Sequence, residues 1–208
     1  MRALLLLTAV VVAGTFAVSA SATVRPINAH DRALLARSAT YEEQIAEQVA
    51  ARLTGRKSAV RCGSLGISDP NVLGVTFLGR DYFLMLPAEC TYLAWFRESP
   101  PRWDPHTCVQ SDCAIVPKIA MALAVVAHES YHILGYSNEA QVDCYGMQSI
   151  WFVASKLGAP VAEAQALASL YAAQMYPRRR YLSPQYWSPE CRDGGRYDLR
   201  RSLARWPS

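Results

Sequence analysis

The sequence contains no internal repeat, no low-complexity tract and no Cys-x-x-Cys pair. The first two absences argue against a repeat architecture and a compositionally biased disordered protein, and 208 residues suit one folded domain with a short tail. The third argues against a zinc site built from thiolates, because structural zinc sites commonly use closely spaced cysteines. Histidine is also scarce: the chain has four, and two of them stand within residues 128–132.

The first 22 residues are expected to be a secretory signal peptide. Arg2 gives a positive start, residues 3–18 form an apolar run without charge, and Ala20-Ser21-Ala22 offers small residues for cleavage near Ala22. The alternative is a membrane anchor over residues 3–22, which are almost long enough to span a bilayer. The small residues at the end of the run favour cleavage.

Six cysteines follow this segment, an even number that fits a disulfide framework in an oxidising compartment. Spacing alone does not fix which cysteines are joined. Closeness in sequence favours one small loop first. The expected pairs are Cys108 with Cys113, then Cys62 with Cys90 and Cys144 with Cys191.

The arginines are concentrated near the C-terminus. Residues 177–208 contain eight arginines and three acidic side chains, which gives +5, so residues 23–176 carry −2 once the net charge of +4 is corrected for Arg2. We expect residues 23–176 to form the main domain and residues 177–208 to form a solvated extension pinned by a disulfide. Its charge suits weak contact with anionic surfaces, and no nucleic-acid partner is expected.

Hydrophobic periodicity and the positions of glycine and proline predict a mainly helical α+β fold, with a small sheet before the central helix. A capping residue and a following glycine or proline set most of the predicted boundaries. The predicted helices are 31–53, 115–134 with Pro117 in its first turn, 138–157, and 161–176 stopped by Pro177; the predicted strands lie within 72–86, with a turn at 79–81, and at 91–96; residues 56–71 and 98–112 are predicted to be loops.

The segment His128-Glu129-Ser130-Tyr131-His132 lies in the apolar helix predicted over 115–134. Two histidines four residues apart project from one face of a helix. Together they can hold a metal ion, and Glu129 can take a proton from metal-bound water. A coincidental helix is the alternative, but buried imidazoles and a carboxylate without partners would be costly. The segment therefore predicts a metal site.

A catalytic zinc site needs a third protein ligand and an open position for water. Glu139 follows a short loop at the start of the next predicted helix, so a helical hairpin would bring it back over the histidine pair. Asp143 shares its face and could accept the spare N–H of a ligand histidine. Gly146 lies on the same face, where a missing side chain would let the two helices approach closely. We therefore expect His128, His132 and Glu139 to bind the metal.

The pattern of residues 128–132 is the His-Glu-x-x-His signature, and in this the chain resembles the zincin metallopeptidases. Metzincins add a third histidine at the position of Asn138, whose neutral amide is a poor zinc ligand. Gluzincins use a glutamate on a following helix, commonly with an aspartate four residues later, and Glu139 and Asp143 match that spacing. The resemblance therefore favours a gluzincin-like site.

Residues 139–146 also resemble a Glu-x-x-Ala-Asp-Cys-[Phe/Tyr]-Ala-Gly segment of predicted neutral zinc metallopeptidases of bacteria, with Val142 in place of the alanine. The link between the second histidine and Glu139 is much shorter than in thermolysin-like enzymes, and the resemblance covers only about residues 120–151. It implies a zincin-like fold, with a small sheet before the active-site helix and further helices after it. It does not identify a substrate.

The expected function is that of a secreted zinc-dependent metallopeptidase acting on a peptide or protein. Zn²⁺ would activate a water molecule, and Glu129 would serve as general base. Two alternatives remain open. One is a zinc amidase acting on cell-wall material, and the other is a secreted non-enzymatic module that binds zinc or an anionic polymer.

Hydrolysis of an amide also needs a donor for the oxygen on which negative charge develops. Several side chains near the motif in sequence could supply it, and their spacing does not choose among them. The candidates are Tyr131, Tyr136, Tyr145 and His106. The predicted strand at 77–86 could form the edge of the cleft, where an extended peptide would add as another strand.

Overall fold

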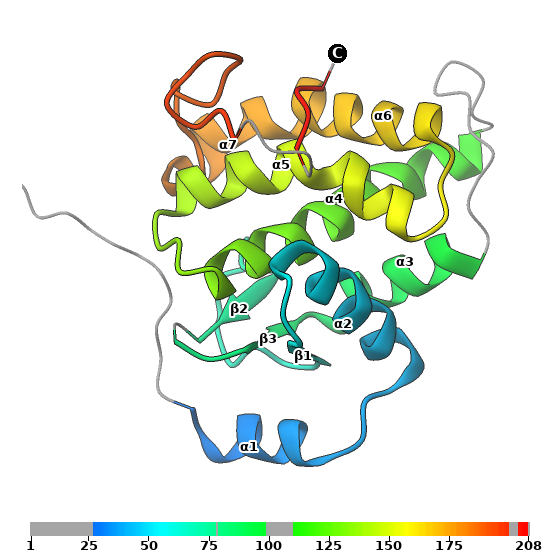
Figure 1. Cartoon of the computed structure of the whole chain (residues 1–208), viewed down its shortest axis with the longest axis vertical. Helices are drawn as coiled ribbons and strands as arrows, with labels where there is room; N and C mark the ends of the chain where they lie inside the picture. Colours follow the sequence, from blue (N-terminus) through cyan, green and yellow to red (C-terminus); the bar gives the residue numbers. More distant parts are fainter. Residues whose placement is uncertain (1–26, 78, 99–109, 200–203, 208) are drawn as a thin grey trace, which may run out of the picture.

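The computed structural model describes residues 27–77, 79–98, 110–199 and 204–207, with the backbone only at 110–113. It is mainly helical with one small sheet, which confirms the α+β prediction (Figure 1). The elements are helices α1 (Ala29–Ala36), α2 (Tyr41–Thr54), α3 (Pro87–Glu98), α4 (Gln110–Ile133), α5 (Glu139–Lys156), α6 (Val161–Leu170) and α7 (Tyr176–Leu182), strands β1 (Ala59–Cys62), β2 (Gly74–Thr76) and β3 (Tyr82–Met85), the π-helical turn η1 (Tyr171–Met175) and the 3-10 turn η2 (Pro184–Tyr186).

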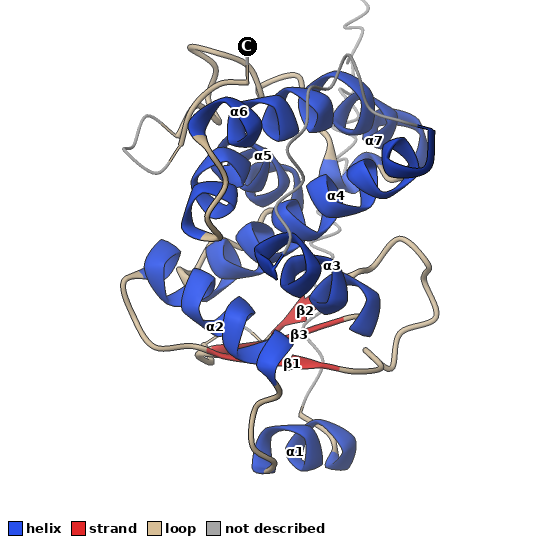
Figure 2. Ribbon diagram, turned by 90° about the vertical axis from the view of Figure 1, so that its right-hand side faces the viewer, coloured by secondary structure: helices blue, strands red, loops and turns tan. Residues whose placement is uncertain are grey.

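The sheet has the strand order β1-β3-β2, with β1 parallel and β2 antiparallel to β3. Helix α1 covers one face, while α2 and α3 lie on the other (Figure 2). Side chains of β3 therefore alternate between two apolar clusters: Phe83 and Met85 pack with the helices, and Tyr82 and Leu84 pack on the α1 side. Both faces are covered, so every residue of β3 is buried.

Helix α4 runs through the middle of the helical layer, with α2 and α3 on one side and α5 and α6 on the other. Residues Ala114–Ile133 are long and apolar enough to cross a membrane, but 72% of that window is buried inside the protein, as expected for a core helix. A Cβ on Gly146 would stand 3.2 Å from the Ala124 carbonyl oxygen and 3.3 Å from the His128 nitrogen. This confirms that Gly146 allows the close approach of α5 to α4.

The helix predicted over 31–53 is two helices. Asn28 caps α1 through a reciprocal pair of hydrogen bonds with Asp31, and Thr40 caps α2 in the same way with Glu43. Each capping box starts a new helix because it satisfies the first free N–H groups of that helix. Gly55 ends α2 in a left-handed conformation with φ of 72°, as predicted.

The prediction of a strand at 91–96 is wrong, because this segment belongs to α3. Its buried residues Cys90, Leu93 and Ala94 follow helical spacing, and this outweighs the β propensity of its aromatic residues. The predicted loop at 56–71 contains β1, which forms by pairing with β3. The predicted hairpin is confirmed, since β2 and β3 are antiparallel and Gly79 has a φ of 77°.

Two prolines occupy positions in the helices that differ from the predicted ones. Pro117 lies inside α4, which begins at Gln110, and not in its first turn. Pro177 does not stop the last helix, because the helical run continues through η1 into α7. The π turn shifts the hydrogen-bond register just before Pro177, which then stands in the first turn of α7, where a missing N–H is tolerated. The boundary expected at residue 176 therefore falls within a continuous helical run.

Two of the expected disulfides are present. Cys62 joins Cys90, and Cys144 joins Cys191, with Cα–Cα distances of 6.3 and 5.6 Å. Two disulfides indicate an oxidising, extracytoplasmic environment. The expected Cys108–Cys113 pair and the expected signal peptide lie outside the described residues.

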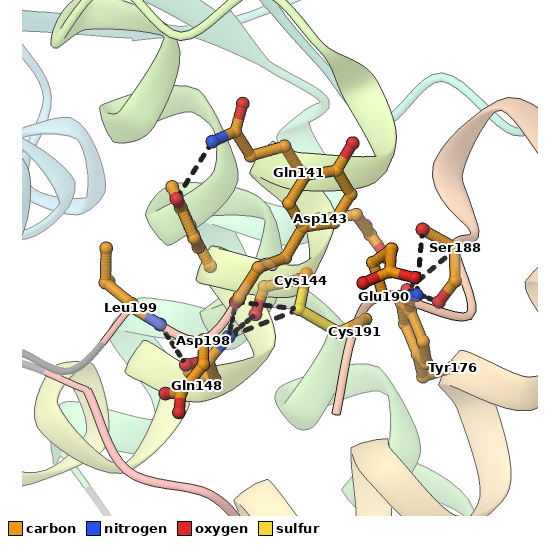
Figure 3. The surroundings of a disulfide bond; sticks show 12 residues. Gln141, Asp143, Cys144, Gln148, Tyr176, Ser188, Glu190, Cys191, Asp198 and Leu199 are labelled. Carbon is orange, nitrogen blue, oxygen red and sulfur yellow. Dashed lines mark hydrogen bonds between the residues drawn. A yellow bond between two sulfur atoms is a disulfide. The ribbon is translucent and has the colours of Figure 1, made fainter. Parts of the chain in front are cut away.

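The C-terminal segment lies across α5 and is tied to it at several points (Figure 3). Besides the disulfide of Cys191, the buried Gln148 side chain donates to the Tyr197 carbonyl at 2.7 Å and accepts from the Leu199 nitrogen at 3.0 Å. The Gln148 carbonyl accepts from the Arg205 nitrogen at 2.9 Å. Much of the predicted extension is thus fixed to the main body.

Candidate metal site

The three predicted ligands, His128, His132 and Glu139, converge where α4 ends and α5 begins. The Nε2 atoms of His128 and His132 are 3.0 Å apart, and the Oε2 atom of Glu139 lies 3.1 Å from the first and 3.4 Å from the second. All three side chains are buried. These three residues form a group that could hold a metal ion.

A short turn brings Glu139 back to the histidines. Gly135 ends α4 with a φ of 95°, a conformation that favours glycine, and its nitrogen donates to the His132 carbonyl at 2.9 Å. Asn138 then caps α5 by accepting from the Gln141 nitrogen at 2.8 Å. Glu139 is therefore the first residue of α5, held directly over the end of α4.

The far nitrogens of the two imidazoles also face acceptors. His132 Nδ1 lies 2.7 Å from the Tyr136 carbonyl oxygen, so Nδ1 carries the proton and Nε2 is left as an acceptor or ligand. His128 Nδ1 lies 3.6 Å from Asp143 Oδ1, just beyond a direct hydrogen bond. Both rings are oriented as metal-binding histidines usually are.

The charges of this group favour a cation at its centre. Burial alone would lower the pKa of His128, but the carboxylates of Asp143 and Glu139 outweigh it and raise that pKa to about 10. Burial would raise the pKa of Glu139, yet the two histidines bring it down to about 2. A proton on His128 thus supplies the positive charge that a metal ion could supply instead.

Glu129 lies between α4 and the edge strand β2. Residues alternate in direction along a strand, so Gly74 and Thr76 face α4 while Val75 packs on the other side. Thr76 Oγ1 donates to Glu129 Oε2 at 2.7 Å, and a Cβ on Gly74 would meet Glu129 Oε1 at 2.5 Å. Burial is the largest influence on the Glu129 carboxyl and raises its pKa. Strand β2 therefore fixes where this carboxylate stands.

An open pocket with an empty volume of about 340 Å³, part of it open to solvent, reaches this group. One wall comes from β2 and the residues before it, a second from α4, and the rest from α5, η1, α7 and η2. The lining includes Asn71, Leu73, Gly74, Met121, Ala124, Val125, His128, Glu129, Asp143, Tyr171, Arg179 and Tyr186.

Arg179 and Tyr186 were missed by sequence reasoning, which placed both in a solvated extension. Arg179 Nη2 lies 3.5 Å from the Tyr171 hydroxyl and 3.7 Å from Asp143 Oδ1, and its guanidinium stands 5.2 Å from the centre of the Tyr186 ring. The Tyr186 ring centre is 5.7 Å from that of His128. A helix that continued from Tyr171 past Pro177 would have placed Arg179 on the same face as Tyr171, two turns later. The prediction that Pro177 ends the helix hid this signal.

The three tyrosines that were candidates for the oxyanion donor lie away from this pocket. Tyr131, Tyr136 and Tyr145 form an aromatic cluster with ring centres 5.2 to 6.1 Å apart. The Tyr131 hydroxyl bonds to Ser149, and none of the three lines the pocket described here. His106 lies outside the described residues.

Comparisons of the chain with models of protein families, with curated proteins and with solved structures found no match. The assignment of a function therefore rests on the residues of the pocket and on their geometry.

Proposed function

We propose that the protein is a secreted zinc-dependent metallopeptidase. The observation that carries the proposal is the convergence of His128 Nε2, His132 Nε2 and Glu139 Oε2 at distances of 3.0 to 3.4 Å. Ligands at zinc bond lengths in a tetrahedral arrangement stand about 3.3 Å from one another. Two imidazoles and one carboxylate are also the donor set of several catalytic zinc sites, and they leave a fourth position free.

His128, His132 and Glu139 would hold the zinc ion, which would supply Lewis acidity and lower the pKa of a water molecule toward neutrality. Glu129 then accepts a proton from the attacking water at its carboxylate and delivers it to the leaving nitrogen. Thr76 restricts the carboxylate to one orientation through the hydrogen bond to Oε2, so the other oxygen, Oε1, is the one available for the proton. Burial keeps bulk water from competing at this carboxylate.

The substrate proposed is a peptide in an extended conformation. Strand β2 is at the edge of the sheet, and its residue Gly74 lines the pocket beside Glu129. An extended chain can pair with such an edge through main-chain hydrogen bonds, which suits peptides of varied sequence. The same chemistry could act on an amide of cell-wall material, but the edge strand favours a peptide.

Glu129→Gln tests this proposal. We expect zinc to stay bound at one equivalent while cleavage of a peptide library falls by at least about 10³-fold, because the general base is lost and the ligands are not. His128→Ala should lose both zinc and cleavage. Glu42→Gln, on the partly exposed face of α2, is the matched control and should change neither.

Full cleavage by Glu129→Gln, or a parent protein that binds no zinc, would refute the mechanism. A parent that binds zinc and cleaves no peptide would point instead to a non-enzymatic zinc-binding module.

A further inference from the structure

Amide hydrolysis needs a hydrogen-bond donor for the carbonyl oxygen, because negative charge develops there in the transition state. Tyr186 lines the pocket beside His128 and Glu129, and its ring centre lies 5.7 Å from that of His128. A phenol is protonated at neutral pH and can donate one hydrogen bond. The Tyr186 hydroxyl has no hydrogen-bond partner among the described residues, and its side chain is partly buried and lines the pocket.

The position of Tyr186 is fixed from both sides along the chain. Its own nitrogen donates to the Ser183 carbonyl at 2.9 Å, within the 3-10 turn η2. Two residues later, the Ser188 nitrogen donates to the Tyr176 hydroxyl at 3.2 Å, and Cys191 is joined to Cys144 of α5 (Figure 3). A donor fixed before the substrate arrives needs little reorganisation during the reaction, and this is what makes such donors effective.

Arg179 orients the same ring. Its guanidinium stands 5.2 Å from the ring centre of Tyr186, within the range of a cation–π contact. The guanidinium is itself placed by the Tyr171 hydroxyl at 3.5 Å and by the Asp143 carboxylate at 3.7 Å.

We propose that Tyr186 is the catalytic residue that donates a hydrogen bond to the carbonyl oxygen of the scissile amide. This inference rests on the proposed peptidase function. As the water oxygen bonds to the carbonyl carbon, the electron pair of the C=O π bond moves to the carbonyl oxygen, and Tyr186 donates to that oxygen without giving up its proton. Glu129 takes the proton of the water. When the C–N bond breaks and the C=O bond re-forms, that proton goes to the leaving nitrogen.

Tyr186→Phe is the test, because it removes the hydroxyl and keeps the ring against Arg179 and His128. With the best-cleaved peptide from a library as substrate, kcat should fall about 10²-fold, while KM and the Kd for zinc stay close to those of the parent. A phosphinic analogue of that peptide, which mimics the tetrahedral transition state, should bind more weakly by a similar factor. Tyr181→Phe is the matched control: this tyrosine is in the same segment, its side chain is 78% exposed, and its loss of a hydroxyl should change none of these values.

A Tyr186→Phe protein with the kcat and phosphinic-peptide affinity of the parent would overturn the role of Tyr186. If Glu129→Gln were inactive in the same assay, the proposed peptidase would still stand. A fall in the affinity for zinc that matched the fall in kcat would also overturn it, because Tyr186 would then act only by supporting the metal group. A parent protein that binds zinc but cleaves no peptide would overturn both proposals.

Discussion

Gly74→Ala perturbs the close approach of strand β2 to Glu129, which together with the Thr76 hydrogen bond determines where this carboxylate stands. A Cβ at this position would lie 2.5 Å from Glu129 Oε1, 2.7 Å from its Cγ and 2.8 Å from its Cδ. All three distances are well below ordinary van der Waals contact, so either the carboxylate or strand β2 must move by roughly 1 Å. Gly74 has no left-handed backbone angle, so the effect comes from the added methyl group alone.

The expected consequence is loss of turnover in a protein that remains folded and loaded with zinc. A displacement of about 1 Å at a general base lowers the rate by about 10²-fold, and overpacking at one site lowers the free energy of unfolding by about 1–3 kcal/mol. The ligands His128, His132 and Glu139 are not touched by the new methyl group. The zinc content of the variant should therefore equal that of the parent.

The assay combines peptide cleavage, metal analysis and thermal unfolding on the same preparation. Gly63→Ala is the matched control. A Cβ there would meet the Leu34 side chain at 3.0 Å, on the α1 side of the sheet and away from the pocket. The Gly63→Ala substitution should lower the free energy of unfolding and leave kcat unchanged. If Gly74→Ala kept the kcat of the parent with zinc bound, the position of Glu129 against β2 would not be what catalysis requires.

Two further predictions concern buried carboxyl groups. Asp143→Asn should weaken zinc binding by about 10–100-fold, because the carboxylate facing His128 Nδ1 is lost, and an unchanged Kd in a metal titration would contradict its orienting role. Burial raises the pKa of Glu89 to about 7 from an ordinary 4.5, so the folded state binds this proton more tightly than the unfolded state. The contribution of Glu89 to stability is thus full below about pH 4.5 and declines by about 3 kcal/mol at most as the pH rises through 7. Glu89→Gln should remove that decline. The free energy of unfolding in urea should therefore fall less for the variant than for the parent between pH 4.5 and pH 8. An equal fall in both proteins would contradict the prediction.

Local sequence patterns were enough to predict the helices that carry the three proposed metal ligands. His128 and His132 share a face because a helix has a fixed period, and Asn138 and Gly135 are sufficient to end one helix and start the next. Glu139 could be placed over the histidines because the connecting turn is too short to take it elsewhere. Two disulfides were also anticipated, because cysteines far apart in sequence had no closer partners after Cys108 and Cys113 were paired.

Other features depend on contacts between segments distant in sequence. Strand β1 exists because β3 pairs with it, and residues 91–96 are helical because Cys90 and Leu93 are buried together in the core. The helical run through Pro177 depends on a π turn that no composition rule signals. These are positions where tertiary packing outweighs local propensity.

The sequence by itself determined which chemistry is available: two imidazoles at fixed helical spacing with a carboxylate between them, and a second carboxylate at the start of the next helix. Only the tertiary structure decided what surrounds them. It places Gly74 and Thr76 against Glu129, and Arg179 and Tyr186 in the wall of the pocket, although these residues come from a strand and from a segment that sequence alone assigned to solvent. The reason is physical: helical period is a local property of the chain, whereas the walls of a pocket are formed by non-local packing, hydrogen bonds and a disulfide.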